Sequence, residues 1–216
     1  MFTLQNPTRR RLLAGCAGLA FSSLAAAIGL KDPLPANGVL LKYDILYKGE
    51  KVGEHLMKAT PDGELVRLEH TRHIDVKVLF ITAFTERHQS TEWWTKSVML
   101  RKLEARNLVN GKEVDITGRA LPDGFVFVVD GKEQKVPADA VTLDSYWVAN
   151  AVKRSTVIDV ANGKVFKTSS KILPNGSVEL NAKDLVAKFA YQGDFMSRGE
   201  LEQDGNTIVY QRISGP

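Results

Sequence analysis

Apolar and polar residues alternate with a period of two along the middle of the chain. From Val66 to Phe84 the even-numbered row carries most of the apolar side chains, and most odd positions as far as Lys77 are polar or charged. The row runs Val66, Leu68, His70, Arg72, Ile74, Val76, Val78, Phe80, Thr82 and Phe84. Side chains of a strand point alternately to its two faces, so the pattern predicts strands with one row against a core.

The whole stretch from Glu64 to Asn110 lacks glycine and proline, which elsewhere punctuate the chain. An unbroken strand from Glu64 to His88 would span about 80 Å, which exceeds the size of a small domain. We therefore expect a bend, bulge or split near Asp75–Lys77. The stretch is predicted to form the central meander of a curved antiparallel sheet.

Further alternating segments flank this stretch, separated by turn signals such as Lys48-Gly49, Asn110-Gly111 and Asp130-Gly131. Short β-rich segments separated by turns are typical of sheets and barrels. The predicted strands are Val39–Tyr47, Val52–Ala59, Val114–Thr117, Phe125–Val129, Lys164–Ser170, Leu185–Tyr191 and Thr207–Ile213. The predicted fold class is mainly β, as a curved antiparallel sheet or partly closed barrel with one short helix packed on it.

Two segments depart from the strand pattern. Met99–Val109 is rich in helix formers, but its position between β segments favours a strand. In Asp144–Arg154 the apolar residues share one helical stripe, Asp144 can serve as the N-cap, and the segment ends in two cations. We expect a short helix there.

The first 27 residues are typical of an export signal, with Thr8-Arg9-Arg10-Arg11-Leu12-Leu13 before a modestly apolar segment. This core resembles the twin-arginine signal, although the usual lysine after it is absent, so general secretion stays open. Cleavage at Ala25-Ala26-Ala27, retention as a membrane anchor and lipidation at Cys16 are alternatives. We expect a signal at 1–27, a short linker at 28–38, a single β-rich domain at 39–216 and a periplasmic location.

Composition narrows the function classes. Residues 1–27 hold three of the 29 basic residues and no acid, which leaves 26 basic against 25 acidic residues in the rest. This balance gives no reason to expect a nucleic-acid partner or membrane contact beyond the signal segment. The one cysteine, Cys16, lies within the signal, so the exported chain must rely on its core rather than on disulfides.

Histidines and acids supply one set of candidate site residues. His55, His88 and Glu92, with His70 or His73, could form a metal or acid–base site across neighbouring strands, although none shows a diagnostic ligand spacing. The alternative is that they are locally hydrogen-bonded strand residues. With an even hairpin loop after Tyr47, His55 would share a face with Asp44, opposite Tyr43.

Aromatic residues supply the second set. Trp93, Trp94, Tyr146 and Trp147 could line a pocket between the sheet and the helix, or they could be core residues. Nucleophile-elbow and phosphate-binding glycine motifs are absent from the sequence. No cofactor is expected.

Several short motifs together resemble a family of exported bacterial β-rich proteins known only as a domain of unknown function. They are Gly53-x-His55, His88-x-x-x-Glu92-Trp93, Tyr146-Trp147 and a closing Tyr191-x-Gly193-Asp194 with Asp204-Gly205-Asn206-x-Ile208-x-Tyr210. The resemblance implies a curved antiparallel sheet and an envelope location. It assigns no role to the motif positions.

Three hypotheses follow. The leading one is a non-enzymatic periplasmic protein that binds an apolar or amphiphilic ligand in the concave face of the sheet, with His55, His88, Glu92, Trp93, Trp94, Tyr146 and Trp147 as candidate ligand-binding residues. The second is an enzyme or metal-dependent site built on His55, His88 and Glu92. The third is an envelope assembly or interaction module.

Overall fold

The computed structural model describes residues 37–216, apart from 79–80, 150, 184 and 204. The predicted signal at 1–27 and nearly all of the predicted linker at 28–38 lie outside the described residues. The strands are β1 (Val39–Tyr47), β2 (Glu50–Asp62), β3 (Leu65–Val78), β4 (Ile81–Thr95), β5 (Leu100–Val109), β6 (Lys112–Leu121), β7 (Gly124–Val129), β8 (Lys132–Val136), β9 (Val141–Thr142), β10 (Thr156–Ile158), β11 (Val165–Lys167), β12 (Ser169–Ile172), β13 (Val178–Ala182), β14 (Leu185–Gln192), β15 (Phe195–Gln203) and β16 (Asn206–Ser214).

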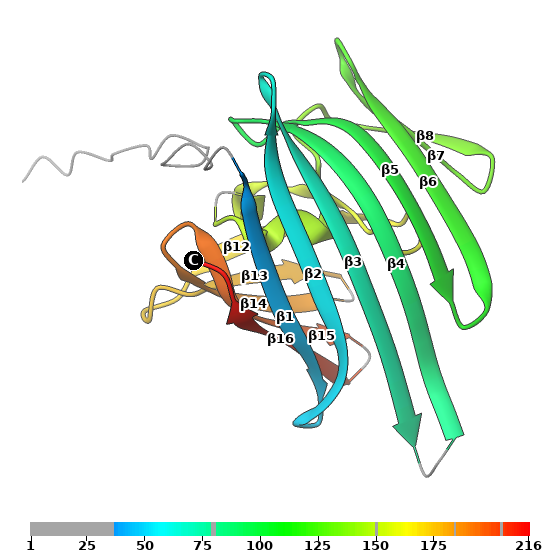
Figure 1. The fold of residues 1–216 in the computed structure, drawn as a ribbon. Helices are drawn as coiled ribbons and strands as arrows, with labels where there is room; N and C mark the ends of the chain where they lie inside the picture. Colours follow the sequence, from blue (N-terminus) through cyan, green and yellow to red (C-terminus); the bar gives the residue numbers. More distant parts are fainter. Residues whose placement is uncertain (1–36, 79–80, 150, 184, 204) are drawn as a thin grey trace, which may run out of the picture.

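Most strands join one antiparallel sheet of 13 strands, in the order β12-β13-β14-β15-β16-β1-β2-β3-β4-β5-β6-β7-β8. The first and last strands of the chain pair with each other, because β1 lies between β16 and β2. Figure 1 shows β1–β6 as one broad layer of long strands. The edge strands β8 and β12 have no pairing with each other among the described residues, so the sheet curves without closing.

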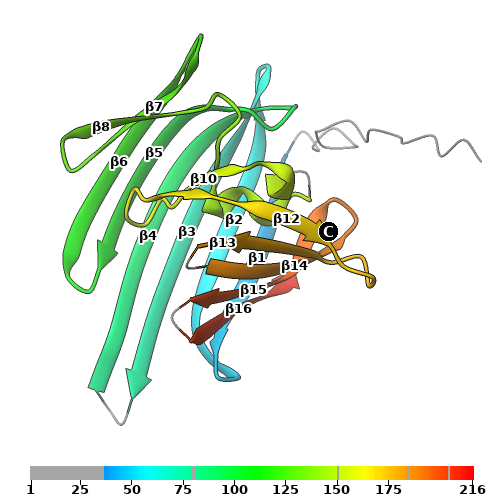
Figure 2. The same ribbon diagram turned by 180° about the vertical axis from the view of Figure 1, so that it is seen from behind.

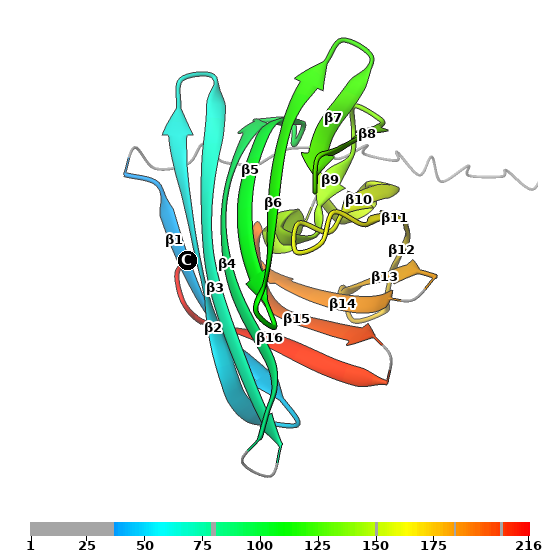
Figure 3. The same ribbon diagram turned by 90° about the vertical axis from the view of Figure 1, so that its right-hand side faces the viewer.

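A second, smaller unit fills the concave side. Strands β11, β10 and β9 form a three-stranded sheet, and two 3₁₀ helices, η1 (Leu143–Trp147) and η2 (Ala151–Lys153), precede β10. Figure 3 shows this unit between the curved layer and strands β13–β16, and Figure 2 shows it from the other side. The predicted fold class, a mainly β protein with a curved antiparallel sheet, is confirmed.

The period-two pattern of the central stretch matches the burial of β3. Val66, Leu68, His70, Arg72, Ile74 and Val76 are all buried. The predicted break also occurs: the β3–β4 register shifts between Val76 and Lys77, and β3 ends at Val78. Met99–Val109 forms strand β5 from Leu100, as its context predicted.

Two-residue turns connect the strands of several hairpins. Asn110 and Asp130 have φ values of 49° and 50°, and the glycines after them also have positive φ. Two successive positive φ values define the type I′ turn, whose twist matches that of the flanking strands. The Asn-Gly and Asp-Gly signals therefore predicted these turns correctly.

The predicted helix over 144–154 was wrong in detail. The helix η1 ends before Val148, whose φ of −113° and ψ of 135° are extended. Val148 forms a β-bridge with Phe195 of β15. This tertiary pairing competes with a continuous helix. Asp144 does not act as an N-cap, because position 142 is the N-cap residue and the Asp144 side chain points to the sheet.

The main core lies between the curved layer and the smaller unit of β9–β11, η1 and η2, which we call the insert. It includes Leu41, Leu68, Leu103, Ile116 and Phe125, and it continues into Tyr146, Trp147, Val157 and Ile158 of the insert. A smaller cluster of Ile45, Ile74 and Val76 lies toward the β1–β2 turn. In the described part of the chain, no helix has the length and apolar character needed to cross a membrane.

Candidate functional site

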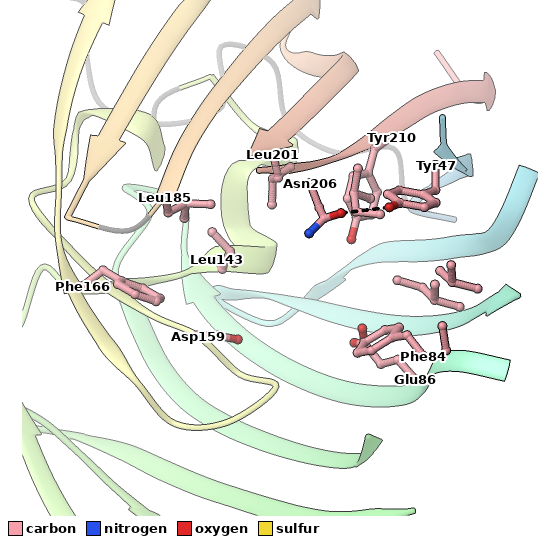
Figure 4. A pocket seen from close by; sticks show the side chains of 14 residues that line it. Tyr47, Phe84, Glu86, Leu143, Asp159, Phe166, Leu185, Leu201, Asn206 and Tyr210 are labelled. Atoms are coloured by element: carbon pink, nitrogen blue, oxygen red, sulfur yellow. Dashed lines mark hydrogen bonds between the residues drawn. The ribbon is translucent and has the colours of Figure 1, made fainter. Parts of the chain in front are cut away.

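A cavity of about 530 Å³ lies on the concave side of the sheet. Its volume falls within the range of roughly 300–1,000 Å³ common for small-molecule sites. Most of its lining is apolar or aromatic. Residues of the long strands β1, β3 and β4 and of strands β14–β16 contribute to it (Figure 4). The lining consists of Tyr47, Ile74, Val76, Ala83, Phe84, Glu86, Leu143, Asp159, Phe166, Leu185, Leu201, Asn206, Ile208 and Tyr210.

A few polar groups interrupt this apolar lining. The Tyr47 hydroxyl donates a hydrogen bond of 2.8 Å to Oδ1 of Asn206, which links β1 to β16 (Figure 4). The Asp159 carboxylate accepts hydrogen bonds from the Ala161 amide and the Asn162 side chain. Burial raises the pKa of Asp159 above its ordinary value, because loss of water disfavours the charged form.

Glu86 connects the cavity to a buried ionic cluster. Arg72 donates from Nε and Nη2 to Oε1 of Glu86 at 3.0 and 2.7 Å, and from Nη1 to Asp144 at 2.5 Å. Asp144 is also 2.9 Å from Nε2 of His88. Burial alone would raise the pKa of Asp144, but the charges of Arg72 and His88 hold it well below its usual range.

Strand register explains how the cluster assembles. Arg72 of β3 pairs with His88 of β4, and His88 pairs with Asn107 of β5. Directly paired residues place their side chains on the same face, so the three polar groups lie side by side on the concave surface. Asp144 then reaches them from η1, which ties the insert to the sheet.

His88, Ser90 and Asp144 are neighbours, but they are not arranged as a catalytic triad. Ser90 Oγ lies 3.1 Å from Nε2 of His88, the same nitrogen that faces Asp144. The other nitrogen, Nδ1, contacts Oδ1 of Asn107. In a triad the serine and the carboxylate contact different nitrogens of the histidine ring. One nitrogen accepts the serine proton, and the other donates to the carboxylate, which orients the ring.

Glu92 lies in a separate buried contact. Its Oε2 accepts hydrogen bonds from Nε1 of Trp94 at 2.8 Å and from the Thr142 hydroxyl at 3.1 Å. Burial raises the pKa of Glu92 to about 8, against these two hydrogen bonds, which act in the opposite direction. At neutral pH the side chain is therefore largely protonated and joins β4 to the start of the insert.

His55 lies on the face opposite to the one expected. The β1–β2 register shifts between Ile45 and Leu46, where an extra residue in β2 forms a bulge. His55 consequently pairs with Tyr43 instead of lying on the face of Asp44. Its Nε2 is 3.1 Å from Nδ1 of His70, and burial, followed by the charge of His70, holds the His55 pKa well below its usual value. Burial likewise lowers the pKa of His70 to about 4.

The four candidate aromatics occupy two environments, the outer face of the sheet and the main core. Trp93 lies on the outer face, where its indole donates to Asp62 at 3.0 Å and Lys102 sits 4.4 Å from the ring centroid. Trp94 is buried on the inner face as part of the main core, where its indole donates to Glu92. Tyr146 and Trp147 belong to the main core, and Trp147 stacks on Phe195 with ring centroids 5.7 Å apart.

None of the seven residues expected from the sequence lines the 530 Å³ cavity. His55, Tyr146 and Trp147 border a smaller space of about 70 Å³ beside Arg72 and Asp144. In the described part of the chain, no group of three or more His, Cys, Asp or Glu side chains is arranged to hold a metal ion. The histidine hypothesis thus gains no support from ligand geometry.

Sequence reasoning missed the residues that line the cavity and the centre of the ionic cluster. One available signal was Arg72 itself, a charged residue in an otherwise apolar buried row, since buried charges require partners. Phe84 belongs to the alternating apolar row, and Ile208 and Tyr210 are positions of the closing motif, but neither pattern indicated that these residues meet at one cavity. They come from strands far apart in sequence, and only the pairing order brings them together.

Comparisons with known proteins agree with the fold. The model of a family described as Domain of unknown function (DUF6134) matches residues 43–213, and the chain belongs to this family. A solved structure, the "Beta-barrel-like Protein of Domain of Unknown Function DUF1849 from Brucella abortus", is similar at a TM-score of 0.59 and 8% identity. The match covers 84% of this chain and 98% of that one, and it supports the fold alone. No curated protein matches the chain.

Proposed function

We propose that this protein is exported to the periplasm and binds an apolar or amphiphilic molecule in the cavity on the concave side of its sheet. The observation that carries the proposal is the cavity of about 530 Å³ with a mainly apolar lining. A mainly apolar cavity of this size can bury much of a small ligand's surface, and a few polar groups orient the ligand.

The buried polar cluster supports a binding role over a catalytic one. Arg72, Asp144 and His88 are engaged with one another. A general base must be free to meet a substrate proton, and a nucleophile needs a free base beside it. We assign the cluster a positioning role, in which it fixes η1 and therefore Leu143 at the cavity wall.

Native mass spectrometry of the protein purified gently from its own cell envelope tests the binding role, with a metal assay on the same sample. We expect a stoichiometric organic adduct in the intact protein and no metal in stoichiometric amount. A bare mass in the native spectrum would count against a tightly held ligand. A stoichiometric metal would instead favour the alternative site on His55, His88 and Glu92.

Export is tested separately by changing the arginine pair of the signal. If the twin-arginine route is used, Arg9→Lys with Arg10→Lys should leave the uncleaved precursor in the cytoplasm, while the single change Arg11→Lys should be tolerated. Export of the double variant at the normal level would contradict this route. General secretion would then be the remaining path to the periplasm.

A further inference from the structure

The charges that line the cavity all have one sign. Among its fourteen described lining residues there are two acids, Glu86 and Asp159, and no lysine, arginine or histidine. The neighbouring cation, Arg72, already bonds to both Glu86 and Asp144. An anionic ligand would therefore find no cation in the described lining, and the adjacent Arg72 already bonds to Glu86 and Asp144.

Glu86 has an oxygen available for a ligand. Both hydrogen bonds from Arg72 go to Oε1, and no hydrogen bond to Oε2 occurs among the described residues. The residue is only 6% exposed, yet it lines the cavity. Oε2 is not among the fully buried oxygens that lack a partner, so a cationic N–H group in the cavity can reach it and donate a charge-assisted hydrogen bond.

Aromatic rings surround the same end of the cavity. Figure 4 shows Phe84 beside Glu86, with Tyr47 and Tyr210 across the space from them. The faces of aromatic rings attract cations, and the attraction grows when the cation is removed from water. Rings and a carboxylate together form an environment that suits a positively charged nitrogen, whereas Leu143, Leu185 and Phe166 add apolar lining on the side where Asp159 also lies (Figure 4).

We propose that the ligand of this cavity is a cationic amphiphile, with its positively charged nitrogen beside Glu86 and its apolar chain along Leu143, Leu185 and Leu201. This inference rests on the proposed binding function and names the chemical class of the ligand. A ligand without charge would fill the apolar part but would offer Glu86 no charge-assisted hydrogen bond.

Displacement of the neutral apolar dye 1-N-phenylnaphthylamine tests the inference with ligands of equal chain length. We compare dodecylammonium, whose charged nitrogen carries N–H donors, and dodecyl sulfate at neutral pH, each below its micelle concentration. The cationic ligand is expected to displace the dye at a concentration at least about tenfold lower than the anionic one. Equal potency, or stronger displacement by dodecyl sulfate, would overturn the cationic class while leaving the binding function intact.

Two cavity variants and one control variant locate the preference for the cationic ligand. Glu86→Gln keeps an oxygen acceptor for Arg72 but removes the charge, so the cationic preference should fall several-fold while dye binding is retained. Glu104→Gln on the outer face, where Glu104 pairs with Lys102 at 2.7 Å, is the matched control and should leave the preference unchanged. Asp159→Asn provides a second test at the cavity should Glu86→Gln fail to fold. A preference that survives both cavity variants would overturn the inference, and a wild-type protein that binds neither dye nor ligand would overturn the binding function itself.

Discussion

Arg72 is a buried guanidinium held between two carboxylates, and its role in stability differs from that of the ion pairs on the surface. Its side chain is 8% exposed, as is that of Glu86, whereas Arg87 and Asp75 are 50% and 38% exposed. Water screens the exposed pair and compensates for its loss. Removing one partner of the buried set instead leaves uncompensated charge inside the protein.

We therefore predict that Arg72→Met destabilises the fold by about 3–5 kcal/mol, because Glu86 and Asp144 lose their shared partner. Arg87→Met, which breaks the exposed pair with Asp75, should cost less than about 1 kcal/mol. Urea denaturation followed by circular dichroism measures both. Equal effects of the two substitutions would show that the buried cluster contributes no more than a surface pair.

Glu92 is predicted to make stability depend on pH. Its folded-state pKa, about 8, lies above its ordinary value of 4.5, so the folded state holds a proton that the unfolded state releases. Stability from this group is full below about pH 4.5 and falls as the pH rises toward 8, by roughly 3 kcal/mol between pH 4.5 and 7. Glu92→Gln, which cannot ionise, should lose this part of the pH dependence in denaturation curves recorded across that range. An unchanged pH profile in the variant would contradict a buried, protonated Glu92.

At the level of elements, the sequence predicted strands and turns well but not the register of the first hairpin. Alternation and the Lys48-Gly49 turn were readable because each has a local physical signature. The bulge opposite Ile45 and Leu46 adds one residue without disturbing the alternating pattern, and it moves His55 to the other face. The helix predicted over 144–154 was wrong for a related reason, because the bridge from Val148 to Phe195 is a tertiary contact that no local pattern shows.

Gly53, next to this bulge, is predicted to be required for the packing of β2 on β3. A Cβ atom added there would lie 2.1 Å from the His73 carbonyl oxygen and 3.0 Å from Cα of Ile74. Because both are backbone atoms, Gly53→Ala must push the strands apart, and we expect a loss of about 1–3 kcal/mol. Lys58→Ala, an exposed change in the same strand, should stay within about 0.5 kcal/mol. A thermal melt in which both variants match the wild type would argue against the close approach.

At the level of the whole molecule, the sheet order creates the cavity. Pairing of β1 with β16 joins the two ends of the described chain and brings Tyr47 within 2.8 Å of Asn206, 159 residues apart in sequence. No periodicity encodes such a pairing, so the sequence predicted a concave sheet but not which side chains would line its hollow. The aromatic residues chosen from the sequence belong to the core and the outer face instead.

A titration with 1-N-phenylnaphthylamine tests most directly whether the cavity on the concave side of the sheet holds an apolar molecule. Ile208→Trp places a larger side chain in the cavity, whereas Leu56→Trp makes the same kind of change on the outer face, where Leu56 is 37% exposed. We predict saturable dye binding to the wild type and to Leu56→Trp, and binding weakened by about tenfold or more in Ile208→Trp at unchanged circular dichroism. Equal dye binding by all three proteins would place the dye elsewhere and contradict ligand binding in this cavity.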